Sequence, residues 1–156
     1  MTASYHKYKQ GVYTPTNKAK CLSQYLAYRS SLELKVMRQF DSSTNILEWA
    51  SEEIAIPYQN PLKIKKDGQP KICNYYPDFY IKVRTKDGGQ LKCLIEIKPD
   101  SQTRPPVDKK RRSKNKLLYE QLRYAQNVSK WTAAQSWCQT NGFKFLIMTE
   151  KDIEKL

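Results

Sequence analysis

Three charged residues lie at the ends of two strand-like stretches, where a purely structural hairpin would not place charge. Asp78 precedes the stretch 79–85, and Glu96 and Lys98 stand two positions apart where the stretch 91–97 ends. Because side chains of a strand alternate between its faces, Glu96 and Lys98 share one face of the sheet. Two carboxylates can hold a hard cation such as Mg²⁺, and a lysine can orient or deprotonate a water. Hydrolysis of a phosphodiester needs these groups.

A β-hairpin is predicted over the two stretches, because Asp87-Gly88-Gly89 between them is a strong turn signal. The loop length decides the face on which Asp78 lies, since a one-residue slip of register moves every side chain to the other face. A two-residue turn at Asp87-Gly88 would pair Asp78 with Ile97, on the wrong face. A three-residue loop, Asp87 to Gly89, pairs Asp78 with Lys98, diagonal to Glu96. We therefore expect an odd-length loop or a bulge.

A structural interpretation of the same charged residues competes with the metal site. Asp78 would then only stabilise a turn that follows a proline, and Glu96 would form an ion pair with Lys98 on an exposed strand face. The segment Cys93 to Ile97 is too apolar for a solvated edge, however, and burying charge without a metal or a partner is costly. The sequence therefore favours a metal site.

The composition predicts a polyanionic partner. The formal net charge is +13, with 28 Lys and Arg against 15 Asp and Glu, so nucleic acid is the leading candidate. Six cations occur between positions 109 and 116, and we expect them to contact phosphates at the rim of the cleft, although such runs are often only solvated. These cations are Lys109, Lys110, Arg111, Arg112, Lys114 and Lys116. No apolar run is long enough to indicate a membrane segment, so no membrane partner is expected.

The cysteines and the single histidine argue against zinc. Four cysteines are scattered without paired spacing, and His6 lies in a polar N-terminal segment. Zinc sites usually combine closely spaced cysteine and histidine ligands. The chemistry is therefore left to carboxylates and lysine, and the cysteines are expected to be reduced.

A length of 156 residues with 39% apolar content predicts one domain with a modest core. We expect an N-terminal arm over residues 1–20 and a single domain over residues 21–156. On the long helix, Asn127, Lys130 and Trp131 either line the cleft or belong to an exposed face. The elements predicted from periodicity and stop signals are a helix over 30–40, strands over 46–49 and 53–58, a basic loop or small hairpin over 59–72, a helix over 117–140 and a strand over 143–149.

Pro77-Asp78 followed by Glu96-Ile97-Lys98 resembles the motif of the PD-(D/E)XK nuclease superfamily. Three ordered blocks, 28–33, 49–58 and 76–80, widen this resemblance to the head-completion nucleases of T-even-type tailed phages, which are themselves similar to TnsA-type endonucleases. The resemblance covers about residues 11 to 150. It implies an α/β, PD-(D/E)XK restriction-endonuclease-like core, with a mixed central sheet and a helix on each side.

The resemblance also implies roles for single residues. Asp78 and Glu96 would bind Mg²⁺, for which Mn²⁺ could substitute, with the backbone carbonyl of Ile97 as a further ligand. Lys98 would position the attacking water. Glu33 would complete the metal site from the first helix.

A structural role competes at Glu33, because Ser30 and Glu33 also form a capping-box pattern, and a carboxylate folded back onto its own helix end cannot ligate a metal. Glu52 or Glu53 is the alternative for this accessory carboxylate. Two adjacent glutamates such as these more often lie in a solvated turn.

The function implied is that of a Mg²⁺-dependent DNA nuclease acting in phage head completion, which cuts packaged DNA so that a filled head accepts a tail. The expected partners are DNA and the capsid portal or other head-completion proteins, in the host cytoplasm during assembly and in the virion. One alternative is a TnsA-like transposition endonuclease or junction resolvase. Another is a catalytically inactive head protein that binds DNA or the portal.

Overall fold

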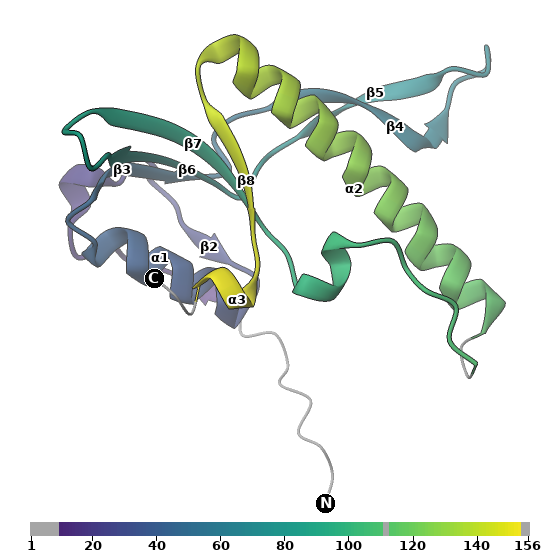
Figure 1. The fold of residues 1–156 in the computed structure, drawn as a ribbon, viewed down its shortest axis with the longest axis horizontal. Helices are drawn as coiled ribbons and strands as arrows, with labels where there is room; N and C mark the ends of the chain where they lie inside the picture. Colours follow the sequence, from purple (N-terminus) through teal and green to yellow (C-terminus); the bar gives the residue numbers. More distant parts are fainter. Residues whose placement is uncertain (1–9, 111–112, 154–156) are drawn as a thin grey trace, which may run out of the picture.

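The centre of the protein is a four-stranded sheet, seen in a computed structural model that describes residues 10–110 and 113–153 (Figure 1). Its strands, in order across the sheet, are β3 (Ile46–Ser51), β6 (Phe79–Arg84), β7 (Gln90–Ile97) and β8 (Lys144–Met148). β6 pairs antiparallel with β3 and β7, whereas β8 runs parallel to β7. The sheet is therefore mixed, as predicted.

A long helix covers each face of this sheet, which confirms the predicted arrangement (Figure 1). α1 (Ser31–Ser42) packs on the face that carries Ile95, and α2 (Lys114–Asn141) packs on the face that carries Leu94. Because neighbouring side chains of β7 enter different cores, the strand is apolar along its length rather than alternating. This explains the run of apolar residues around Glu96.

Several smaller elements surround the sheet. β4 (Ile56–Ile64) and β5 (Pro70–Tyr75) form a separate antiparallel hairpin that packs against α2, so the segment predicted as a loop or small hairpin is a hairpin. The N-terminal half of α2 extends beyond the sheet (Figure 1). The remaining elements are β1 (Gly11–Val12), η1 (Lys18–Lys20), β2 (Ala27–Tyr28), η2 (Asp100–Thr103) and α3 (Glu150–Ile153). No helix in the described ranges is long and apolar enough to cross a membrane.

The segment before α1 packs on the domain, with β1 paired to β2 and Tyr13 against the core. The Tyr13 ring lies 6.3 Å from the ring of Trp49, and its hydroxyl donates to the buried carboxylate of Asp41 at 2.7 Å. The backbone amides of Thr16 and Asn17 donate to the same carboxylate. The division into an arm over 1–20 and a domain over 21–156 stays a prediction, because residues 1–9 and 154–156 lie outside the described part of the chain.

Local signals set the ends of both long helices. The hydroxyl of Ser30 accepts from the amide of Glu33, and that of Ser113 accepts from the amide of Lys116, as N-cap residues do. Gly142 ends α2 in the left-handed conformation, with φ of 73°. The predicted end of this helix near residue 140 is confirmed, while α2 begins three residues earlier than predicted.

The β6–β7 hairpin has a three-residue loop, so the expected odd length is confirmed. Its position was wrong by one residue: the loop is Lys86 to Gly88, because Arg84 pairs with Gln90 and the amide of Thr85 donates to the carbonyl of Gly89. Gly88 has φ of 85° and takes the left-handed position that closes such loops. Phe79 then pairs with Ile95, so Asp78 comes opposite Glu96 rather than opposite Lys98.

Gly88→Ala should destabilise the protein by about 1–2 kcal/mol, the usual cost of a side chain in the left-handed region. A Cβ at this position would meet no atom within 4 Å, so the cost is conformational rather than steric. Thermal unfolding should show Tm falling by about 2–4 °C per kcal/mol. Gly88→Asn is the matched control, since Asn tolerates this conformation, and equal losses for both variants would contradict the explanation.

Candidate active site

Glu96 is a buried carboxylate with a partner on each oxygen. The residue is 5% exposed, inside a sheet covered on both faces. The hydroxyl of Tyr75 donates to Oε2 at 2.5 Å, and Nζ of Lys98 lies 3.1 Å from Oε1. The end of β5 and the residue after β7 therefore meet at this carboxylate, which keeps Glu96 and Lys98 on one face as predicted.

Asp78 lies beside Glu96, and its pKa is raised. The amide of Ile97 donates to Asp78 Oδ2 at 2.7 Å. Burial, followed by the negative charge of Glu96, raises the pKa of Asp78 to about 8, although the Ile97 amide and Lys98 act in the opposite direction. Two acids thus face each other, and burial keeps the pKa of Asp78 high despite the nearby Lys98.

Tyr75 and Lys130 complete the surroundings of the acid pair. Nζ of Lys130 lies 5.6 Å from the centre of the Tyr75 ring and 5.8 Å from that of Tyr58. Burial lowers the pKa of Lys130, and Glu96 opposes this shift. Burial, then the charge of Glu96, raises the pKa of Tyr75. The sequence left open whether Lys130 lines the cleft or belongs to an exposed helix face, and it gave no signal for Tyr75.

Glu33 acts as a helix cap in the structure. Its carboxylate accepts from the amide of Arg29 at 2.9 Å, while the Ser30 hydroxyl accepts from the Glu33 amide at 3.1 Å. Glu52, one of the alternatives for the accessory acid, lies 3.3 Å from the guanidinium of Arg29. The charge of Glu33 still reaches Asp78, where it is one of the groups that raise the pKa. Ligation of a metal by Glu33 stays a prediction.

The acid pair fits a hard divalent cation. Within residues 10–110 and 113–153, no three Asp, Glu, His or Cys side chains gather into a ready-made ligand group. Mg²⁺ does not need such a cage, because it is usually held by one or two carboxylates and keeps several waters. Asp78 and Glu96, with the carbonyl of Ile97 between Glu96 and Lys98 in the chain, offer oxygen ligands of this kind. The raised pKa of Asp78 marks the place where a cation would be stabilised.

A groove of about 820 Å³ begins at Lys98 and runs between the segment after β7 and the N-terminal half of α2. Lys109 lines it, and so do Asn127 and Lys130, whereas Trp131 packs its ring edge-on against Tyr124. The predicted DNA-contacting residues Lys110, Lys114 and Lys116 are exposed. Arg111 and Arg112, predicted with them, lie outside the described residues.

Residues 43–150 match the N-terminal family of TnsA-like endonucleases. The chain belongs to the TnsA-like endonuclease family. A relative named head completion nuclease, from Enterobacteria phage T4, is 31% identical over 151 residues that cover 94% of each chain. The resemblance found in the sequence is confirmed, as is the PD-(D/E)XK-like α/β fold. The matched range contains Asp78, Glu96 and Lys98 and begins after Glu33.

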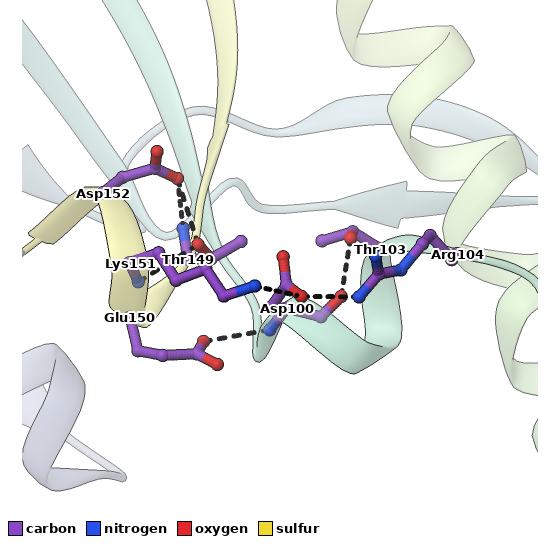
Figure 2. Close-up of polar contacts among 7 residues, drawn as sticks. All are labelled: Asp100, Thr103, Arg104, Thr149, Glu150, Lys151 and Asp152. Atoms are coloured by element: carbon purple, nitrogen blue, oxygen red, sulfur yellow. Dashed lines mark hydrogen bonds and ion pairs between the residues drawn. The ribbon is translucent and has the colours of Figure 1, made fainter.

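In this TnsA-like domain, the segment that follows Lys98 is fastened to the C-terminal elements (Figure 2). The carboxylate of Asp100 lies 2.5 Å from Arg104 and 3.0 Å from Nζ of Lys151, and its amide donates to Glu150. The hydrogen bond from Lys151, together with the charge of Arg104, lowers the pKa of Asp100. Asp152 in turn accepts from the amide of Thr149 at the start of α3. This network fixes one wall of the groove.

Asp78→Asn should raise the Tm of the metal-free protein. Asn keeps an oxygen that can accept from Ile97 but removes the charge that faces Glu96. Because the pKa of Asp78 is raised by folding, the wild-type protein loses stability as the pH rises from about 4 towards 8. The advantage of the variant should therefore grow between pH 5 and pH 8 in EDTA.

Calorimetry with added Mg²⁺ supplies the second half of this test. Mg²⁺ should raise the Tm of the wild-type protein, since a ligand that binds only the folded state stabilises it. It should raise the Tm of Asp78→Asn far less. A variant that is no more stable at pH 8 than at pH 5, relative to wild type, would contradict the repulsion between the two acids.

Proposed function

We propose that this protein is a Mg²⁺-dependent deoxyribonuclease that hydrolyses phosphodiester bonds in DNA. The observation that carries the proposal is the pair of adjacent acids, Asp78 and Glu96, with the Lys98 ammonium 3.1 Å from Glu96. Membership of an endonuclease family supports the same reaction. The net charge of +13 supports a polyanionic substrate.

Each residue has a defined task in the proposed mechanism. Asp78, Glu96 and the carbonyl of Ile97 hold the Mg²⁺, or Mn²⁺ in its place. The cation, when bound, neutralises phosphoryl charge and acidifies water. Lys98 orients the attacking water and stabilises charge on the phosphoryl oxygens. The Tyr75 hydroxyl fixes the carboxylate of Glu96.

Two further side chains assist in this proposal. Lys130 adds a positive charge that faces the acid pair from α2. Glu33 assists as an additional negative charge near Asp78, and its contact with Arg29 would have to open before it could ligate the cation directly.

We propose head completion as the biological setting, because the phage T4 relative is named for that process and covers nearly the whole chain. The protein would trim or cut packaged DNA so that a filled head accepts a tail. It would meet the portal or other head-completion proteins in the host cytoplasm and remain with the virion. The family match also supports a TnsA-like transposition endonuclease as a second candidate, and a junction resolvase stays an untested alternative. The intact group of Asp78, Glu96 and Lys98 argues against an inactive structural protein.

Asp78→Asn and Lys98→Ala should each lower DNA cleavage by at least about a hundredfold, because each removes a group that acts on the transition state. DNA affinity should hold or rise in Asp78→Asn, since phosphate contacts lie elsewhere. Cleavage is measured on supercoiled and linear DNA with Mg²⁺ and then with EDTA. Metal-induced stabilisation should persist in Lys98→Ala and disappear in Asp78→Asn.

Lys86→Ala is the matched control for Lys98→Ala, because Lys86 is exposed in the loop at the far end of the β6–β7 hairpin. It should cleave at the wild-type rate. Glu33→Gln keeps an oxygen that can cap α1 and tests the assisting charge alone. Folded Asp78→Asn protein that cuts DNA like wild type would reject the proposed mechanism.

Replacing Lys109, Lys110, Lys114 and Lys116 by Ala should weaken the salt dependence of DNA binding. Each cation that meets a phosphate contributes roughly 0.9 to the slope of log affinity against log salt on duplex DNA. The slope is measured by titration at several salt concentrations, and the metal dependence of residual cleavage should not change. An unchanged slope would mean that these lysines are only solvated.

A further inference from the structure

The groove that begins at Lys98 has a lining suited to an unpaired nucleic-acid strand. It brings basic and aromatic side chains together between the segment 101–109 and α2. The basic ones are Lys98, Arg104, Lys109, Arg123 and Lys130, and the aromatic ones are Tyr119 and Tyr124. We propose that this groove binds a single DNA strand continuous with the scissile phosphate, so that the preferred substrate has an unpaired flank beside the cut. This inference rests on the nuclease function proposed above.

The aromatic residues distinguish a single strand from a duplex. Tyr119 is 58% exposed and lines the groove. The guanidinium of Arg123 lies 5.4 Å from the centre of its ring, and Nε of Arg123 donates to its hydroxyl at 3.1 Å. The ring is thus held in place at the surface. Bases of a duplex are stacked inside the helix, whereas unpaired bases can stack on such a ring.

The positions of the lining residues along α2 form a continuous track to the acid pair. Tyr119, Arg123, Asn127 and Lys130 follow the three- and four-residue spacing of one helix face. At 1.5 Å per residue this face is about 16 Å long. Lys130 is the last of the four and lies over Tyr75, whose hydroxyl holds Glu96. A strand lying in the groove would therefore lead directly to the proposed site of cleavage.

The opposite wall supplies fixed positive charge. Arg104 lies 2.5 Å from Asp100, which Lys151 also contacts (Figure 2). Arg104 lines the groove. Lys109 lies further along the same wall. Cations on both sides match a backbone that carries one negative charge per nucleotide, and rings on the helix side match its bases. A flat duplex-binding surface would need only the cations.

The test compares binding of two DNA probes to the whole chain in EDTA. One probe is a blunt duplex, and the other is the same duplex with a single-stranded tail containing 2-aminopurine. The wild-type protein should bind the tailed probe more tightly and change its fluorescence. Tyr119→Ala should weaken binding of the tailed probe about tenfold, in the range expected for loss of one stacked base, and leave the blunt duplex within twofold.

Two variants separate stacking from charge. Tyr119→Phe keeps the ring and should retain the affinity for the tail. Arg123→Ala should lower the salt slope for the tailed probe by roughly 0.7, the contribution of one phosphate contact on a single strand, whereas Tyr119→Ala should leave that slope unchanged. Circular dichroism checks that each variant is folded. Equal affinity of the wild-type protein for both probes, or a folded Tyr119→Ala that binds the tail like wild type, would overturn the proposal.

Cleavage with Mg²⁺ distinguishes the two hypotheses. Cutting that requires Mg²⁺ but shows no preference for the tailed duplex would reject the groove proposal and leave the nuclease function intact. Tail binding that depends on Tyr119, without cleavage of any probe, would support the groove and reject the nuclease function.

Discussion

The burial of Glu96 constrains much of this structure. A carboxylate inside a sheet that is covered on both faces must have partners for its oxygens, because isolated buried charge is strongly unfavourable. Tyr75 and Lys98 meet that requirement, which ties the end of β5 and the residue after β7 to one point. Asp78 adds a second acid there, and burial beside Glu96 raises its pKa to about 8 although Lys98 and Lys130 lie nearby. A bound cation would relieve the repulsion between the two acids, which a structural ion pair of Glu96 and Lys98 alone would not contain.

Short-range periodicity was enough to predict the central group. Glu96 and Lys98 share a face because strands alternate, and the hairpin signal brought Asp78 to the same end of the sheet. The exact register was wrong, since it depends on which of two adjacent glycines takes the left-handed conformation, and Gly88 does so rather than Gly89. Tyr75 could not be located from the sequence, and Lys130 was left open between the cleft and an exposed face, because β5 and α2 reach the site only through tertiary packing. For Glu33, capping the first turn of α1 competes with ligating a metal beside the distant acids, and in the structure its carboxylate caps the helix.

Chemistry and recognition are placed on different elements. The acid pair is built on strands whose positions are fixed by two cores, whereas the cations and tyrosines of the groove lie on the exposed half of α2 and on the segment after β7. Among the described residues, Lys98 and Lys130 belong to both regions. Under the proposed function, substitutions on the outer half of α2 would change which DNA is bound without disturbing the carboxylates, whereas substitutions in the core would affect both.

The parallel pairing of β7 with β8 has a consequence for biosynthesis. The amide of Lys98 donates to the carbonyl of Met148, and the amide of Asp100 donates to Glu150, 50 residues later in the chain. During translation the acids emerge well before the strand and helix that lock the segment behind them. Contacts so distant in sequence form late. A ribosome-bound chain that ends before β8 therefore carries every proposed metal ligand but lacks the contacts that hold Lys98 and Asp100, so under the proposed function DNA cleavage would wait for synthesis of β8 and α3.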